Sequence, residues 1–283
     1  MANSKVLVTG ADGFIGRSLV RALRDDGYDV TALGRRDGDV TDAATWARLP
    51  AVAHVFHLAG RAYVPDSWAD PAGFIHANVA GTARALDYCR ATGAHLVFTS
   101  VSLFGAPKRL PVHEDDAIEP SNPYALSKCL AEQACAFYAA TWNVPATVIR
   151  LFNVYGPGQR EEYLIPLIVA QVRRREPIRV KTLTPRRDFI FLDDLLAALS
   201  RTMVNPGGYR LINIGSGTSH SVQDVIDAAQ AAAGTRLPVE SSEETRRNEI
   251  PDVRADITRA RELLGWTSQV PFAEGIRRLV EGR

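Results

Sequence analysis

The chain has 283 residues, of which 46% are hydrophobic, and its 33 Lys and Arg residues nearly balance its 32 Asp and Glu residues. This length can bury the core of one large α/β domain with a smaller lobe, while the charge balance argues against a nucleic-acid or membrane surface. The charge balance therefore favours a small-molecule partner. The three cysteines show no paired spacing, and the sequence shows neither a secretory signal nor an apolar run of about 20 residues. We therefore expect a cytoplasmic protein.

Strand and helix patterns alternate through the first half of the sequence. Helical periodicity is found at residues 14–24, 74–91 and 124–141. Continuous apolar runs lie around these segments, at residues 5–9, 30–33, 52–58, 95–100 and 146–151. Such runs are typical of parallel strands covered on both faces. This βαβ alternation predicts an α/β fold with a Rossmann-type, doubly wound parallel sheet.

The pattern changes after Asn153. Glycines and a proline at 156–158 precede a predicted helix at 164–175 and a short strand near Ile178, and further elements are predicted at 188–200, 211–214 and 222–233. We therefore predict a dinucleotide-binding domain formed by residues 1–153 and 187–215, and a smaller, discontinuous α/β substrate lobe formed by residues 154–186 and 216–283. Residues 241–247 are predicted to form a mobile loop.

A glycine-rich turn joins the first predicted strand to the first predicted helix. Its glycines are Gly10, Gly13 and Gly16, and Phe14 and Ile15 open the helix. Glycines let the backbone turn tightly and approach a pyrophosphate, and the amides of a helix N-terminus favour its negative charge. Because the strand and the helix flank the turn as this motif requires, we predict a dinucleotide site here.

The end of the second strand bears on the choice of dinucleotide. NAD-binding folds commonly place an acidic residue there to bind the ribose hydroxyls, but this strand ends in Gly34, Arg35 and Arg36. The two guanidinium groups could bind a 2′-phosphate bidentately. We therefore favour NADP(H), and NAD remains possible if both arginines are merely solvated.

Tyr124 and Lys128 form a candidate catalytic pair. Their spacing places them on one face of a helix, and a nearby ammonium stabilises the tyrosinate that a phenol with a pKa of about 10 rarely forms at neutral pH. Ser100, at the end of a predicted strand, could donate a hydrogen bond to a substrate oxygen as charge develops on it. An ordinary amphipathic Tyr and Lys pair is the alternative.

With these residues in place, the sequence resembles the extended short-chain dehydrogenases called NAD-dependent epimerase/dehydratases, which act on nucleotide sugars. The resemblance covers nearly the whole chain. It rests on VTGADGFIG, GDVTD, HLAG, NVAGT, TSVSLFG, PYALSK, RLFNVYGPGQR, RRDFIFLDDL, NIGSG and ARELLGW.

The resemblance implies roles for individual residues. Asp39 and Val40 would meet the adenine, and Ser100, Tyr124 and Lys128 would be the catalytic residues. The dinucleotide would also be lined by Leu58, Ala59, Gly60 and Asn78, and the nucleotide diphosphate of the substrate would be bound by Asn153, Arg187, Arg246 and Glu249. No metal is expected, and the helices at 78–91 and 124–141 are expected to form a homodimer interface.

Simpler interpretations of several of these residues remain open. Arg187 could pair with Asp188 or Glu161, Asn153 could cap a turn, and Arg246 could be a surface charge. His57 lies inside a predicted buried strand, so we expect a structural role for it.

The resemblance also narrows the reaction. The family's 4,6-dehydratases carry an acidic pair just after the catalytic hydroxyl residue, where this chain has Val101 and Ser102, so dehydration is disfavoured. The two arginines, the short chain and the motifs DSW, RRNEIP and GW favour reduction of a 4-keto-6-deoxy sugar nucleotide by NADPH. The alternatives are a 4-epimerase with tightly bound NAD and a non-catalytic dinucleotide-binding regulator, against which Tyr124 and Lys128 argue.

Overall fold

A computed structural model describes residues 4–102, 105–204, 207–244 and 250–283. The chain divides into two compact units, the first formed by residues 1–106, 117–151 and 198–212 and the second by residues 107–116, 152–197 and 213–283. The second unit thus includes residues 107–116, 152–153, 187–197 and 213–215, which were predicted to belong to the dinucleotide-binding domain. The reason lies in their backbone partners: Val112 bridges to Ala255, and Arg187 pairs with His220 and Val253.

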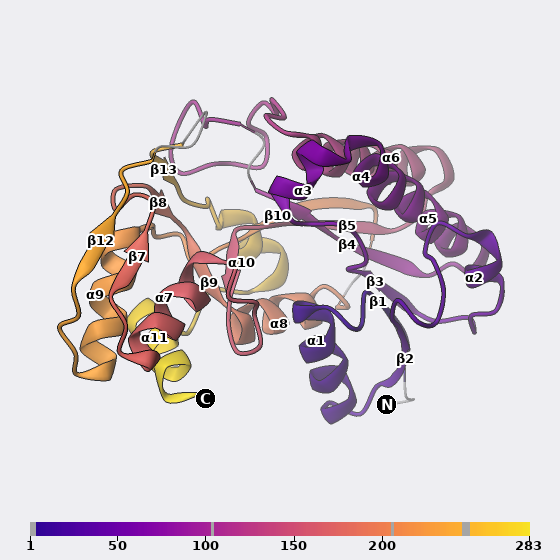
Figure 1. The fold of residues 1–283 in the computed structure, drawn as a ribbon. Coiled ribbons are helices and arrows are strands. Elements are labelled where there is room, and N and C mark those ends of the chain that lie inside the picture. The colour runs from indigo at the N-terminus through magenta and orange to yellow at the C-terminus, as the bar shows by residue number, and fades with distance from the viewer. Residues whose placement is uncertain (1–3, 103–104, 205–206, 245–249) are drawn as a thin grey trace. The chain divides into compact units, whose positions relative to one another are not determined.

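A six-stranded sheet forms the centre of the first unit (Figure 1), in the order β10-β5-β4-β3-β1-β2. The pairs from β2 through β1, β3 and β4 to β5 are all parallel. The strands are β1 (Lys5–Thr9), β2 (Asp29–Leu33), β3 (His54–His57), β4 (His95–Val101), β5 (Ala146–Leu151) and β10 (Tyr209–Ile214). The predicted Rossmann-type parallel sheet is confirmed.

Helices cover both faces of this sheet. In Figure 1, α1 (Phe14–Asp25) lies on one side, and α5 (Gly81–Thr92) and α6 (Pro123–Trp142) lie on the other. The helix predicted at 74–91 is interrupted, because α4 (Pro71–Ile75) passes through a π-helical turn, η1 (His76–Ala80), into α5. Two short helices, α2 (Ala43–Ala47) and α3 (Val64–Ala69), were not predicted.

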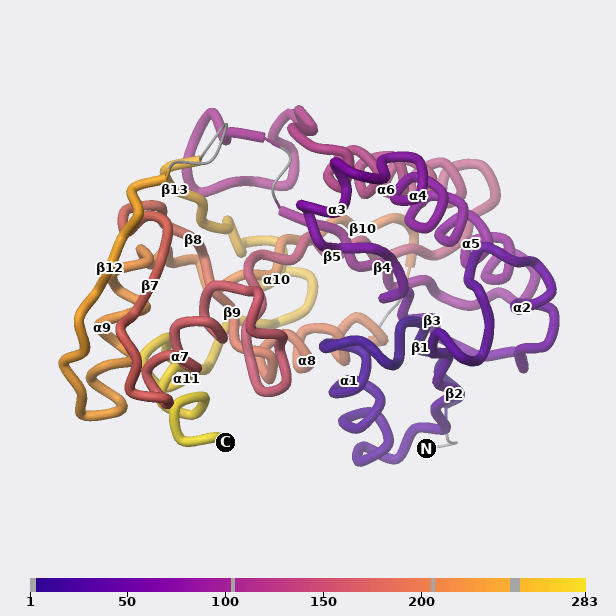
Figure 2. The backbone as a smooth tube through the Cα atoms, in the orientation of Figure 1, coloured from indigo at the N-terminus to yellow at the C-terminus, as the bar shows by residue number. Residues whose placement is uncertain are grey.

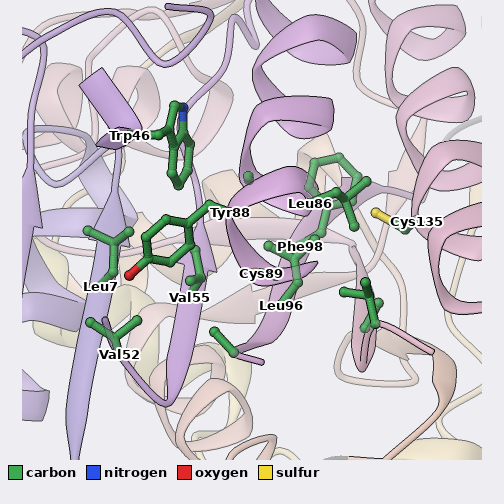
Figure 3. Close-up of a cluster of buried hydrophobic side chains, with 14 of the residues drawn as sticks. Leu7, Trp46, Val52, Val55, Leu86, Tyr88, Cys89, Leu96, Phe98 and Cys135 are labelled. Carbon is green, nitrogen blue, oxygen red and sulfur yellow. The ribbon is translucent and has the colours of Figure 1, made fainter. Parts of the chain in front are cut away.

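The core of the first unit lies between the sheet and the α5–α6 face (Figure 3). Leu7, Val55 and Leu96 come from three neighbouring strands and meet Leu86 of α5 and Cys135 of α6. All five side chains are fully buried. Each of the buried valine and leucine side chains stabilises the fold by about 1.5–3 kcal/mol relative to an exposed one, so this packing holds the strand ends that carry the site.

The described part of the second unit contains three small sheets. They are formed by β6 (Asn153–Tyr155) with β9 (Phe189–Phe191), by β7 (Ile178–Val180) with β12 (Val239–Ser241), and by β8 (Arg186–Arg187) between β11 (His220–Ser221) and β13 (Asp252–Val253). The chain trace in Figure 2 shows α7 (Leu164–Arg174), α9 (Val222–Ala233) and α11 (Phe272–Glu281) packed together. Helix α10 (Thr258–Leu264) also belongs to this unit, and α8 (Leu192–Arg201) is divided between the two units.

Across the described ranges, no helix is both long enough and apolar enough to span a bilayer. The predicted mobile loop at 241–247 lies partly outside the described residues: Val239–Ser241 belongs to β12, and 245–247 are not described.

Candidate active site

The order of the strands indicates where a ligand binds. From β1 the chain goes outward to β2, and then returns to place β3 on the opposite side of β1. Ligands of doubly wound sheets bind at such a reversal, outside the carboxyl ends of the strands. The glycine turn follows β1, and residues 58–60 follow β3, so both predicted dinucleotide segments lie at this point.

The glycine turn has no room for a side chain at Gly10 or Gly16. Gly10 has a φ of +69°, and a Cβ there would lie 2.7 Å from the backbone nitrogen of Ala59. A Cβ on Gly16 would lie 2.1 Å from the carbonyl oxygen of Gly10. The turn is closed by a 2.9 Å hydrogen bond from the Gly13 amide to that oxygen, and Gly13 then caps α1.

A dinucleotide fits this arrangement. A close approach of the backbone to a pyrophosphate needs bare glycines, and the first-turn amides of α1, on Phe14 and Ile15, have no partner inside the helix. These amides would hold the diphosphate of a nicotinamide dinucleotide.

The segment after β2 is charged and exposed. Arg35 and Arg36 are both exposed, and neither guanidinium forms an ion pair with any described residue. Asp39 accepts hydrogen bonds from the amide and the hydroxyl of Thr41, which lower its pKa. Val40 is half-buried against the core. The arginines are therefore available to an anion.

The segment after β3 is held to β1 by hydrogen bonds. Thr9 Oγ1 accepts the amide of Ala59 at 3.2 Å and lies 2.9 Å from His57 Nδ1, and the Leu58 amide donates to the Thr9 carbonyl. His57 is fully buried, and burial lowers its pKa to about 3. A neutral, buried histidine suits the structural role expected for it.

Asn78 connects this segment to α6. It lies in η1 and is 1% exposed. Its side-chain oxygen accepts the Arg61 amide, and its nitrogen donates to the Arg61 carbonyl and to Ser127 Oγ. Ser127 donates in turn to the carbonyl of Tyr124 at 2.7 Å. Asn78 thus holds the backbone at Arg61, directly after residues 58–60, in place against α6.

Ser100 lies on the face of β4 that Lys128 of α6 packs against. Lys128 Nζ lies 4.3 Å from the centroid of the Phe98 ring, and Phe98 and Ser100 point to one side of the strand because they are two residues apart. Ser100 is 3% exposed, and its Oγ has no hydrogen-bond partner in the described structure. A buried hydroxyl left unpaired costs about 1–3 kcal/mol, which makes it a candidate for binding a ligand.

Tyr124 is in the first turn of α6. Asn122 caps this helix by accepting the Ala125 amide at 2.8 Å, and the Tyr124 ring meets Phe74 edge-on with centroids 6.2 Å apart. Lys128 follows one turn later. Burial lowers the pKa of Lys128 to about 8, and Glu132 acts in the opposite direction. A protonated Lys128 would favour the tyrosinate form of Tyr124 and so help it to exchange a proton.

A buried ion pair lies one further turn along α6. Glu132 accepts hydrogen bonds from Arg150 of β5 at 2.8 and 3.1 Å, and both side chains are almost completely buried. This pair was not predicted from the sequence. Glu132 could have been noticed, because it lies four residues after Lys128 and therefore on the same face of the helix.

The predicted substrate residues belong to the second unit, as far as they are described. Asn153 Nδ2 donates to the Asp188 carbonyl at 3.1 Å, and Arg187 Nη1 donates to the carbonyls of Arg186 and Ile250. The Asp188 carboxylate accepts hydrogen bonds from Ser216, Gly217 and Ala255. Arg246 and Glu249 lie outside the described residues.

Comparison with known proteins decides the family. Residues 6–215 match the family model described as NAD dependent epimerase/dehydratase family. The chain belongs to this family. As a member of the NAD-dependent epimerase/dehydratase family, it is an enzyme of the short-chain dehydrogenase type, and the resemblance seen in the sequence is confirmed.

Its relatives in this family include epimerases and a reductase. A UDP-glucose 4-epimerase of Mycolicibacterium smegmatis is 32% identical, over 98% of this chain and 97% of the relative. A GDP-6-deoxy-D-mannose reductase of Pseudomonas aeruginosa is 28% identical, over 98% and 96%. The solved structure of RMD from Pseudomonas aeruginosa in complex with NADPH has a TM-score of 0.90 and 27% identity, over 99% of this chain and 98% of that one.

Proposed function

We propose that this epimerase/dehydratase family member transfers hydride at C4 of a nucleotide-diphosphate sugar, and that its main reaction is the reduction of a 4-keto-6-deoxy sugar nucleotide by NADPH. The observation that carries the proposal is the unpaired, buried hydroxyl of Ser100 on the strand face that Lys128 also occupies. The relatives named for UDP-glucose and GDP-6-deoxy-D-mannose support the substrate class.

The residues divide the chemistry among them. When bound, a nicotinamide dinucleotide supplies the hydride to the carbonyl carbon. Ser100 donates a hydrogen bond to the carbonyl oxygen as negative charge develops on it. Tyr124 gives its phenolic proton to that oxygen, which becomes the product hydroxyl, and the positive charge of Lys128 lowers the cost of leaving a tyrosinate.

The 4-epimerase with retained NAD is the second candidate. It would use the same three residues, and the 32% identical relative named as a 4-epimerase favours it. Dehydration stays disfavoured, because Val101 and Ser102 offer no carboxyl group. Asn153 and Arg187 are proposed to bind the nucleotide diphosphate, with Arg246 and Glu249.

We also propose a homodimer formed through α5 and α6. Leu126 and Phe137 of α6 are 40% and 56% exposed, and residues eleven apart share one face of a helix. Large exposed apolar side chains gathered on one face favour a protein partner.

Turnover with defined substrates tests the proposed reaction. We expect NADPH oxidation with a GDP-4-keto-6-deoxyhexose, and little interconversion of UDP-glucose and UDP-galactose. Mass spectrometry of the dinucleotide released on denaturation is an independent measurement. Stoichiometric NAD, together with interconversion of UDP-hexoses, would show that the protein is a 4-epimerase and not the proposed reductase.

Tyr124→Phe tests the mechanism. The variant should lower kcat by about 10²–10⁴-fold, the usual contribution of a general acid, while binding of the dinucleotide is retained. Turnover at the wild-type rate would show that Tyr124 does not donate the proton.

A further inference from the structure

A carboxylate occupies the end of β2 although no acidic residue ends that strand. Gly34 directly follows β2, and a Cβ built on it would lie 2.2 Å from Oδ2 and 2.5 Å from Oδ1 of Asp12. Asp12 belongs to the glycine turn after β1, 22 residues earlier. Its carboxylate therefore fills the space where a side chain of residue 34 would begin.

The backbone holds Asp12 in this place. Its Oδ2 accepts the Arg35 amide at 2.9 Å. Gly34 leaves the space open, and Asp37 accepts the Gly34 amide at 2.8 Å, which closes the turn. Within the described chain, Oδ1 of Asp12 accepts no hydrogen bond, and the residue is exposed. One carboxylate oxygen is thus available to a ligand at the end of β2.

This position is the one where dinucleotide-binding folds recognise the adenosine ribose. An acid there accepts a hydrogen bond from the 2′-hydroxyl of NAD, whereas the 2′-phosphate of NADP would meet a like charge. Arg35 and Arg36 extend from the same turn and attract a phosphate. The turn therefore carries groups that favour opposite cofactors.

We propose that Asp12 is a cofactor-selecting residue: its carboxylate receives the ribose hydroxyl of NAD(H) and opposes the 2′-phosphate of NADP(H), against the attraction of Arg35 and Arg36. The chain consequently binds NAD(H) more tightly, relative to NADP(H), than the two arginines alone would allow. The inference rests on the part of the proposed function that places a dinucleotide at the glycine turn.

The experiment measures dissociation constants and needs no sugar substrate. NADH and NADPH are titrated into the purified protein by calorimetry at one fixed ionic strength, and the ratio Kd(NADH)/Kd(NADPH) is compared. Asp12→Asn keeps the size of the side chain and removes its charge, so the ratio should rise by about tenfold. The double variant R35A/R36A should lower the ratio by a similar factor.

Two further variants separate position from charge. Gly34→Ala places a methyl group where the Asp12 carboxylate lies, so it displaces the carboxylate at unchanged net charge and should also raise the ratio. Asp26→Asn removes an exposed charge at the other end of α1 and should leave the ratio unchanged.

The possible failures are distinguishable. A ratio in Asp12→Asn that stays within about twofold of wild type, or one that moves equally in Asp26→Asn, would overturn the role of Asp12. If the wild-type protein binds neither dinucleotide, the proposed function itself fails, and this inference fails with it.

Discussion

Ser100, like His57, carries a buried polar side-chain atom that has no hydrogen-bond partner in the described structure. Its side chain is buried among well-packed strands, yet its hydroxyl makes no hydrogen bond in the described structure. More than nine in ten buried polar groups are satisfied, so the exceptions are informative. The free-energy cost of leaving this hydroxyl unpaired would be recovered when a substrate oxygen accepts its hydrogen bond.

Ser100→Ala should therefore separate activity from stability. We expect kcat/KM to fall by about 10²–10³-fold, as for the loss of one preorganised donor. The free energy of unfolding, measured in urea, should be unchanged or slightly higher, because the substitution removes no existing hydrogen bond. A destabilised variant with normal kcat/KM would show that the hydroxyl serves the fold instead.

The residues of the site differ in how far the sequence could reveal them. The glycines, Tyr124 and Lys128 were predictable because their functions depend on spacing within one segment. Asp12 at Gly34 was not, because the two residues meet only when β1 and β2 pair. The internal contacts of Asn78 likewise depend on Arg61 and Ser127, which are distant in sequence.

At the scale of elements, long periodic segments were predicted well. β1, β5 and α9 have the predicted bounds, and α6 extends the predicted helix by one residue at each end, where Asn122 and Asn143 cap it. β8, β11 and β13 were missed because two residues show no periodicity and become strands only through their partners. The π-helical turn η1 was not predicted, because a single turn of five residues is too short to show a sequence pattern of its own.

The ion pair between α6 and β5 gives a prediction about stability. Arg150→Met should leave the buried carboxyl group of Glu132 without the hydrogen bonds that Arg150 donates, and should lower the free energy of unfolding by about 3–5 kcal/mol. Urea denaturation measures this change. The double variant E132L/R150M should recover most of the loss, since replacing both charges by apolar groups is often neutral. Equal destabilisation of both variants would contradict this explanation.

At the scale of the whole molecule, buried histidines link stability to pH. Burial lowers the pKa of both His57 and His95 from 6.5 to about 3. His95 Nδ1 lies 3.3 Å from His54 Nδ1, and its Nε2 lies 2.9 Å from Thr147 Oγ1. Each imidazole is therefore neutral in the folded protein, while the unfolded chain takes up a proton below about pH 6.5.

Stability should consequently rise with pH between about 3 and 6.5, because the unfolded state binds more protons in that window. Each histidine contributes up to about 1.4 kcal/mol per pH unit. Urea denaturation at several pH values measures the slope, and His95→Gln should reduce it. Exposed His76 provides the control His76→Gln, and an equal reduction in that variant would exclude burial as the cause.

The order of the strands also bears on how the chain is made. β5 ends at Leu151, but its neighbour β10 ends only at Ile214, and most of the residues between them belong to the second unit. At ~5–20 residues per second, a ribosome needs roughly 3–13 s to synthesise this stretch. For those seconds the edge of β5 that faces away from β4 has no neighbouring strand in the nascent chain, and an unpaired strand edge of this kind can bind a chaperone or a mispaired chain.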